Sequence, residues 1–509
     1  MQKQTRLFFA CTLALISLAF GFIIRAFLIN DWQQIFNLSK TQIGSIQGAG
    51  LYPQALTILF FSLVVDRIGY GRVIAFAWVG HMLSAVITMT ATGYKGLYWG
   101  TFVFALANGA VEAVVNPVTA TLYPQSKTHH LNMLHSGWPG GLVIGGVLIL
   151  LLGTAGGPGA WRWKVALLLI PTAVYGFMML GQRFPVQERV AAGVSYADML
   201  REFGLAGCLI VSVFAAYALD EILQVFGSRL STTALVIIPL AITGLMATRI
   251  RSFGRPMFVF LMLVMILLAT TELGTDSWIA ALMEPVLKNF GADAGKYVII
   301  YTSVIMFVLR FCAGTITRRI SSLGLLAVCS AIASAGLFWL GHAGAAAGMV
   351  FLAATCYGAG KSFFWPTMLG VVSEQFPKGG ALTISAIAGV GMISVGVLGN
   401  PLLGTIQDHF LDQNLAQEYP ALHEKIVEPA QTKYGLIYRP LDQTRIHGLS
   451  QTEKDEVNRV LTANNQATLA KVAVLPAIMF LCYVSLLLYF KSRGGYRQVH
   501  LQNTGLSNT

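Results

Sequence analysis

Charged residues are scarce in this chain of 509 residues. Asp, Glu, Lys and Arg together make up 11% of it, and 55% is hydrophobic. In soluble domains about a quarter of the residues are charged. The composition therefore excludes an ordinary soluble protein and predicts a chain that crosses a membrane many times. The first apolar stretch, 7–29, is too long for a secretory signal and lacks a small-residue cleavage site, so we expect it to remain as the first span.

Acidic residues are fewer than basic ones, and the formal net charge is +12. The basic residues lie in short turns between apolar runs and form no cluster interleaved with aromatic residues, which argues against a nucleic-acid partner. The six cysteines lie within apolar runs and lack the spacing of metal ligands, so they indicate packing positions and no metal site. The chain contains no phosphate-binding loop or zinc-protease motif. We therefore expect neither a cofactor nor an enzymatic activity.

Apolar runs long enough to cross a bilayer form two sets of six. The first set is 7–29, 41–65, 73–91, 98–123, 133–154 and 161–180. The second set is 256–283, 296–316, 323–340, 345–372, 381–403 and 468–490. Two further runs, 203–226 and 233–248, stand between the sets as a hairpin. This pattern predicts an all-α membrane protein with about 14 transmembrane helices. Because 233–248 is short, twelve spans with a re-entrant hairpin remain an alternative.

The polar segments between these runs predict the domain organisation. We expect a six-helix bundle in 1–181, a cytoplasmic linker in 182–202, an inserted helix pair in 203–252 and five helices of a second bundle in 253–404. Residues 405–467 are too polar to span and predict an outer insertion, 468–490 is the last helix, and 491–509 is a cytoplasmic tail. Ser195 with Asp198, and Ser450 with Glu453, have the spacing of capping boxes, which predicts helix starts in the linker and near the end of the insertion.

The distribution of positive charge predicts the orientation. With both termini in the cytoplasm, the inner turns and tails hold about 17 Lys and Arg and the short outer loops about 7, and shifting the frame by one helix reverses this bias. We therefore expect a multi-pass protein of the cell membrane, the inner membrane if the source is bacterial, with both termini cytoplasmic. We expect a monomer surrounded by the lipid bilayer.

The run 98–123 contains a carboxylate, Glu112, which is costly in hydrocarbon unless it faces a cavity or a partner. Asn116 lies four residues further along the same helical face, next to Pro117, which leaves a backbone carbonyl free. One side of this helix therefore carries a carboxylate, an amide and backbone carbonyls. We predict that this side faces water or a solute.

The turn after the second span, DRIGYGR, resembles the loop signature of the major facilitator superfamily, with Asp66, Arg67 and Arg72 as its gating residues. It departs from the family pattern at Ser62, where the family has glycine, and at Gly71, where it has a basic residue. A similar segment, GTITRRISSLG, follows the corresponding span of the second set. The resemblance covers nearly the whole chain. It implies a major facilitator fold, with two homologous six-helix bundles and the solute site between them.

Within that superfamily, the central stretch is similar to the fucose and glucose/galactose proton symporters. The similarity lies in VEAVVNP, followed by a basic turn and HLN at His130 to Asn132, and in the later SFFWPTMLGVVSEQFP and GVGMISVGVLGNPLLG. It implies that Glu112 carries the proton and that Asn116 and Asn132 line or support the path of a sugar. The superfamily resemblance also implies that Arg310 braces the inner gate.

Arg25 stands in the first helix where those symporters have an aspartate. It either pairs with Glu112, recognises a negative group on the solute, or extends to the outer interface of the membrane. A pair with Glu112 would have to break during a proton-coupled cycle. His135, in the fifth span, is either a proton relay or a hydrogen-bonded structural residue.

Five further residues within the spans are candidates for the solute path. Glu272 and Asp276 share a helical face beside Trp278, where carboxylates can accept sugar hydroxyls and an indole can stack on a sugar ring; otherwise they lie at the outer mouth. Lys361 either lines the path or pairs with one of these carboxylates. Trp365, next to a helix-breaking proline, is also expected in the cavity.

These features predict a secondary active transporter that moves a small polar solute, a sugar or sugar derivative, by alternating access with proton symport. Two alternatives remain open. One is a carrier of organic anions or drugs, in which Arg25 and Lys361 bind the solute and Glu112 is a structural counter-ion. The other is a non-transporting membrane receptor whose outer insertion binds a ligand.

Overall fold

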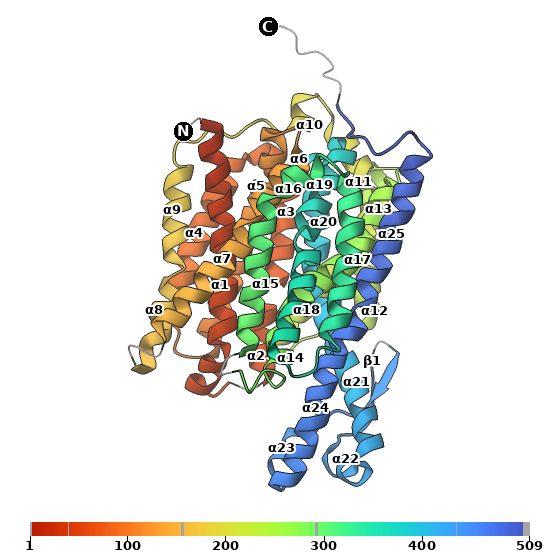
Figure 1. The fold of residues 1–509 in the computed structure, drawn as a ribbon. Coiled ribbons are helices and arrows are strands. Elements are labelled where there is room, and N and C mark those ends of the chain that lie inside the picture. Colours follow the sequence, from red (N-terminus) through yellow and green to blue (C-terminus); the bar gives the residue numbers. More distant parts are fainter. Residues whose placement is uncertain (1–2, 39, 154–156, 291–293, 434, 502–509) are drawn as a thin grey trace.

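The computed structural model describes residues 3–38, 40–153, 157–290, 294–433 and 435–501. In these residues, twelve helical segments are long and apolar enough to cross a membrane (Figure 1). Two more predicted spans, 161–180 and 345–372, each consist of two shorter helices. The 233–248 run forms one helix long enough to span. The prediction of an all-helical membrane protein with about 14 spans is therefore confirmed.

The helices before residue 181 form the first bundle. They are α1 (Lys3–Phe36), α2 (Lys40–Gly48), α3 (Tyr52–Ile68), α4 (Tyr70–Met89), α5 (Tyr94–Leu122), α6 (Lys127–His135), α7 (Gly137–Leu152), the 3₁₀ turn η1 (Gly157–Gly159), α8 (Ala160–Ala166) and α9 (Leu169–Met179). α1 packs closely on α7. A Cβ atom at Gly137, Gly141 or Gly145 would lie only 2.6–2.8 Å from atoms of α1, so glycine at every fourth position allows the two backbones to approach.

The short helix α10 (Glu188–Ala191) leads to the inserted pair, α11 (Tyr196–Val225) and α12 (Thr232–Arg249). α11 begins at the predicted cap, where the Ser195 hydroxyl accepts a hydrogen bond from the Asp198 amide at 3.0 Å. It continues from the predicted linker into the inserted span through a break at Gly204, whose φ of +71° favours glycine. α11 packs against the second bundle, whereas only 6% of α12 is buried within the protein.

The second bundle contains most of the remaining helices. They are α13 (Pro256–Ala269), the π-helical η2 (Thr270–Gly274), α14 (Thr275–Met283), α15 (Ala294–Phe311), α16 (Ala313–Thr317), α17 (Ser322–Leu340), α18 (Ala347–Lys361), α19 (Phe364–Gln375), the 3₁₀ turn η3 (Pro377–Gly379), α20 (Gly380–Ser394), the π-helical η4 (Val395–Gly399), α21 (Asn400–Glu418) and α25 (Val474–Lys491). Between the bundles, α3 packs on α20, α7 on α15 and α6 on α19. The second span of each bundle thus contacts the fifth span of the other, as a twofold relation between two similar bundles requires.

A small polar unit projects from one end of the helices (Figure 1). It contains the outer part of α21, α22 (Pro420–Ile426), the antiparallel strands β1 (Gln431–Lys433) and β2 (Leu436–Tyr438), α23 (Gln443–His447) and α24 (Gln451–Val472). Its own core consists of Leu411, Leu415, Leu422, Ile426, Val457 and Val460. α24 starts at the predicted capping box of Ser450 and Glu453 and leads into α25. We call this end the insertion face, and the opposite end, where α1 begins and α25 ends, the terminal face (Figure 1).

Candidate functional site

A cavity of about 480 Å³ lies between the bundles toward the insertion face. We call it the large cavity. The first bundle contributes residues of α1 and α2 to its wall, and the second contributes residues of α14, α15 and α21. Its polar and charged lining consists of Arg25, Gln47, Asp276, Ser277, Glu284, Lys296 and Asn400. Because both bundles line it, a solute held here would contact the two parts that must move during alternating access.

Arg25 is 9% exposed and lines the large cavity. Its guanidinium carbon lies 5.8 Å from the centre of the Phe22 ring. A Cβ atom at Gly50 would lie 2.2 Å from a guanidinium nitrogen, so the glycine leaves room for the arginine head group. Arg25 forms no ion pair within the described residues. The structure therefore does not support the hypothesis that Arg25 pairs with Glu112.

Asp276 faces the large cavity and forms an ion pair with Lys361, whose side chain is fully buried. The Lys361 ammonium also lies 5.0 Å from the centre of the Tyr357 ring. Trp278, expected to share the solute path with Asp276, lies elsewhere. Its ring packs toward Gly404 of α21, and it does not line the large cavity. Asp276 and Trp278 are two positions apart on α14, so their side chains point to different sides of the helix.

A second, small cavity of about 40 Å³ lies deeper between the bundles. We call it the central cavity. The predicted residues in its wall are Glu112, His135, Glu272, Arg310 and Trp365. Gln54, which was not predicted, also lines it and accepts a 3.4 Å hydrogen bond from Asn108. The structure thus brings together acidic, basic and aromatic side chains that are up to 253 residues apart in sequence.

Glu112 begins a chain of hydrogen bonds within the first bundle. The Asn116 amide nitrogen donates to a Glu112 carboxylate oxygen at 2.6 Å, one helical turn away. The Asn116 amide oxygen accepts from Nε2 of His135 at 2.8 Å. Nε2 of His135 is therefore the donor in this hydrogen bond. Glu112 itself has no cation as a partner within the described residues.

Arg310 connects the two bundles at the inner wall of the central cavity. Its guanidinium donates to the Ser362 carbonyl at 2.7 Å, to the His135 carbonyl and to Glu272 at 3.3 Å. The second Glu272 oxygen accepts from the backbone amide of Trp365 at 3.2 Å. Glu272, a carboxylate of the same bundle, therefore compensates the charge of Arg310. The hydrogen bond to the His135 carbonyl joins Arg310 to the other bundle.

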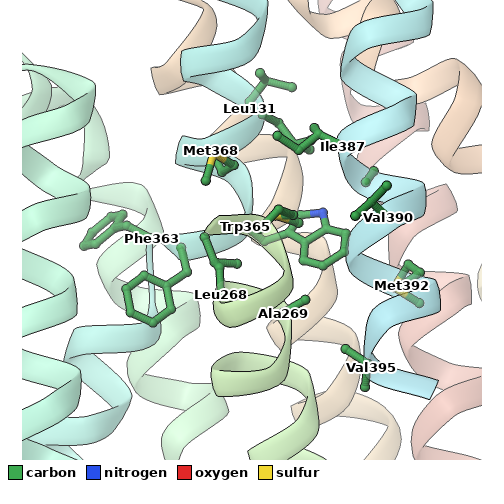
Figure 2. Close-up of a cluster of buried hydrophobic side chains, with 14 of the residues drawn as sticks. Leu131, Leu268, Ala269, Phe363, Trp365, Met368, Ile387, Val390, Met392 and Val395 are labelled. Carbon is green, nitrogen blue, oxygen red and sulfur yellow. The ribbon is translucent and has the colours of Figure 1, made fainter. Parts of the chain in front are cut away.

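The Trp365 indole fills the space between α19, α13 and α20. Figure 2 shows it among Leu268, Met368, Val390 and Met392. A Cβ atom at Gly391 would lie 2.9 Å from the ring, so this glycine allows the indole to lie against α20. Trp365 is 6% exposed, and part of it faces the central cavity.

The terminal face is closed by polar contacts between the bundles. Lys127 donates to Glu188 at 2.6 Å and to the Ser373 carbonyl at 3.2 Å, although its side chain is only 1% exposed. Thr128 donates to Glu374 at 2.6 Å. Asn132, predicted to line or support the sugar path, donates to Thr367 of α19 at 3.1 Å. We call these contacts between the bundles at the terminal face the closed layer.

The residues of the DRIGYGR turn make their contacts within the first bundle and its linker. Asp66 forms a buried ion pair with Arg189 of α10. Arg67 lies 4.8 Å from the centre of the Tyr196 ring. Arg72 is exposed and donates to the Ile68 carbonyl at 3.4 Å, so among the described residues its hydrogen bond is with the preceding turn.

Sequence reasoning missed three residues of the closed layer: Lys127, Glu188 and Glu374. All three lie at helix ends, where charged residues are ordinary markers of topology. Lys127 and Glu374 stood within stretches that carried the family resemblance, but neither was singled out. Their partners are up to 246 residues away, and no local pattern predicts such contacts.

A family model of the Major Facilitator Superfamily matches residues 9–400. The chain belongs to this superfamily. It is therefore a multi-pass membrane transporter, and the resemblance seen in the sequence is confirmed. No curated protein sequence matches the chain.

Solved structures of other superfamily members are similar in fold. The human organic anion transporter MFSD10 (TETRAN) has a TM-score of 0.60 at 12% identity, over 94% of this chain and 98% of that one. The E. coli fucose:proton symporter FucP has a TM-score of 0.58 at 14% identity, over 94% and 98%. The proton:xylose symporter XylE has a TM-score of 0.59 at 13% identity, over 93% and 94%. At these identities the comparison concerns the fold alone.

Proposed function

We propose that the protein is a secondary active transporter that couples movement of a small polar solute, a sugar or sugar derivative, to protons through Glu112. The observation that supports this most is the difference between Glu112 and the neighbouring carboxylates. Glu272 faces Arg310 and Asp276 faces Lys361, whereas Glu112 has only the Asn116 amide as a side-chain partner within the described residues. A carboxylate in this setting is the group whose charge is most costly to enclose.

The free-energy cost of enclosing the Glu112 charge explains how proton binding is coupled to solute movement. Placing a charged carboxylate within a membrane-spanning bundle costs about 3 kcal/mol or more, and binding a proton removes this penalty. Protonated Glu112 therefore permits the cavities to close around the solute, whereas charged Glu112 favours a state in which water reaches it. Solute and proton then cross together when the two bundles rock.

The large cavity is where we place the solute. Its volume of about 480 Å³ falls in the range of about 300–1000 Å³ that is usual for small-molecule sites. Phe22, Phe27 and Leu51 supply apolar contact, while Gln47, Asp276 and Asn400 supply hydrogen-bonding groups. This mixture suits a molecule with many hydroxyl groups and an apolar ring face. We infer that the terminal face is cytoplasmic, so the closed layer there corresponds to an outward-facing state.

The test is uptake into proteoliposomes of labelled hexoses and sugar acids at two external pH values. We expect the natural chain to accumulate a solute more strongly when the outside is acidic. Glu112→Gln should lower accumulation by about tenfold or more, which corresponds to the loss of about 1.4 kcal/mol of driving force, but should preserve exchange of labelled for unlabelled solute. Glu424→Gln, an exposed carboxylate in the insertion, is the matched control.

Coupling through Glu112 would be refuted if Glu112→Gln accumulated the solute with the same pH dependence as the natural chain. The carboxylate would then be structural, and a carrier that binds its solute through Arg25 and Lys361 would be the better hypothesis.

A further inference from the structure

Charged residues of both signs surround the large cavity. Arg25, Lys296, Asp276 and Glu284 line it, and Lys361 lies behind Asp276 as its ion-pair partner. A Glu284 oxygen accepts a 2.8 Å hydrogen bond from the Gly295 amide. An anionic group that enters this cavity from outside therefore meets cations in its wall.

Arg25 is the cation best placed to meet such a group. It is buried to more than nine-tenths, it lies in the cavity wall, and it forms no ion pair with any described residue. The Phe22 ring and the space beside Gly50 set the position of its guanidinium. An arginine at membrane depth is costly without a counter-charge, and its planar head group matches a carboxylate through two parallel hydrogen bonds.

We propose that Arg25 binds an anionic group of the solute, so that the transported class is small polar monoanions such as sugar acids. This inference rests on the proposed transport function and narrows its substrate class. Arg25 would determine specificity by pairing with the solute carboxylate, while hydroxyl groups of the solute meet Gln47 and Asn400. A neutral hexose of the same size would leave the buried cation unpaired and bind less well.

The first experiment compares labelled glucuronate and gluconate with glucose in proteoliposomes. We expect the natural chain to take up at least one sugar acid about tenfold or more faster than glucose, because a site built around a charged partner rejects a solute that lacks it. Arg25→Gln should remove this preference, and Arg25→Lys should retain part of it, since lysine keeps the charge but loses the planar fork. Arg459→Gln, an exposed arginine of the insertion, is the control.

A binding measurement separates this inference from the proposed function. The same compounds are added to the purified protein, and the shift in thermal unfolding temperature is recorded for the natural chain and for Arg25→Gln. Stabilisation by a sugar acid that is lost in Arg25→Gln supports anion binding even if no uptake occurs, in which case the transport proposal fails alone. Uptake of glucose that is indifferent to Arg25→Gln overturns the anion proposal and leaves sugar transport standing. Neither uptake nor stabilisation by any of the compounds overturns both.

The contacts of the segment Tyr496–Val499, which follows the last helix, support a second inference. The Tyr496 hydroxyl donates to Glu374 at 2.6 Å, and the Val499 amide donates to the Glu374 carbonyl at 2.9 Å. Burial raises the pKa of the Tyr496 phenol well above its ordinary value, and the Glu374 charge raises it further, so the hydroxyl keeps its proton. The Gln498 amide donates to the Pro124 carbonyl of the first bundle at 2.7 Å.

We infer that Tyr496–Val499 is a latch that holds the terminal face closed. The segment is covalently part of the second bundle, yet it contacts the first bundle at Pro124. It also binds Glu374, the residue that accepts the bundle-to-bundle hydrogen bond of Thr128. Opening the terminal face separates Pro124 from Gln498 and Thr128 from Glu374, so the latch stabilises the closed state and must release during each cycle.

The latch is tested by the distance between spin labels placed on Arg183→Cys and Arg319→Cys, at the terminal ends of the two bundles, with the native cysteines replaced. Tyr496→Phe and Gln498→Ala should each raise the population with a long distance about threefold or more, as loss of one hydrogen bond does in a two-state equilibrium. Tyr489→Phe, a half-exposed tyrosine of α25, should have no effect. Unchanged distance distributions in both latch variants, with unfolding temperatures equal to that of the natural chain, would overturn the inference.

Discussion

Among single residues, Lys361 and Asp276 lead to the sharpest stability prediction. Their side chains are 0% and 6% exposed. Removing one member of a buried ion pair leaves an uncompensated charge and costs about 3–5 kcal/mol, whereas replacing both members with uncharged groups costs much less. We expect Lys361→Met and Asp276→Asn each to lower the thermal unfolding temperature, and the double variant to recover most of the loss. Losses that simply add in the double variant would show that the two charges are not coupled.

Single residues also show how much of the candidate site the sequence could predict. A carboxylate inside an apolar run predicts a polar environment by itself, so Glu112 and its neighbour Asn116 were found with their helical spacing. Arg25 was singled out because the symporters have an aspartate at that position, but its possible pair with Glu112 is not formed, because pairing depends on the relative depth and rotation of two helices. Trp278 and Asn132 were placed in the solute path, and the structure directs them to α21 and α19. The direction of a side chain across a bundle interface is a tertiary property that local patterns do not contain.

Among the helices, the contact between α6 and α19 is a place where one added methyl group should shift the conformational equilibrium. A Cβ atom at Gly370 would lie 2.2 Å from the Thr128 hydroxyl oxygen and 2.9 Å from its Cα. Overpacking costs about 1–3 kcal/mol, which is similar to the difference between two accessible conformations of a protein. The cost applies only while the terminal face is closed. We therefore expect Gly370→Ala to populate the state open at that face.

The labels on Arg183→Cys and Arg319→Cys measure this shift as an increase in the population with a long distance. Gly348→Ala on α18 is the matched control, because a Cβ atom there would meet nothing within 4 Å. An unchanged distance distribution in Gly370→Ala would mean that α6 and α19 stay in contact throughout the cycle.

Element boundaries show where sequence patterns were sufficient. Hydrophobic length predicted all the spans, and the capping patterns at Ser195 and Ser450 predicted the first turns of α11 and α24; the structure has an N-cap at Ser195 and a full capping box at Ser450. The interruptions were not predicted. The run 345–372 breaks between α18 and α19, beside the buried Lys361, and π-helical turns occur at η2 and η4. Such breaks change the direction of side chains, and Glu272 in η2 lines a cavity. Interrupting the helical hydrogen bonds costs free energy, and contacts with other helices compensate for it. A hydrophobicity pattern contains no information about those contacts.

For the whole molecule, the sequence predicted the superfamily fold and located the polar insertion between the last two spans. It did not predict how the insertion is built. α21 and α24 continue outward from the bundle as a helical pair, with a small core of their own. Near the bundle, the Asn464 amide donates to the Gln407 carbonyl at 2.9 Å and holds the two helices together. This pair is therefore anchored independently of the tip of the insertion.

That anchoring yields a test that separates a transporter from a receptor. Replacing residues 419–450 with a Gly-Ser linker long enough to join Glu418 to Gln451 removes the tip but leaves α21 and α24, which still contact each other where Arg459 donates to Glu418 at 3.4 Å. We expect uptake of the transported solute to stay within about twofold of the natural chain, because the cavities lie elsewhere and the Asn464–Gln407 hydrogen bond near the bundle remains, although the deletion removes Leu422 and Ile426 from the small core. The unfolding temperature of the purified protein serves as the control. If the deletion variant folds with an unchanged unfolding temperature and has no uptake, the insertion takes part in function, and a receptor role for it becomes the better hypothesis.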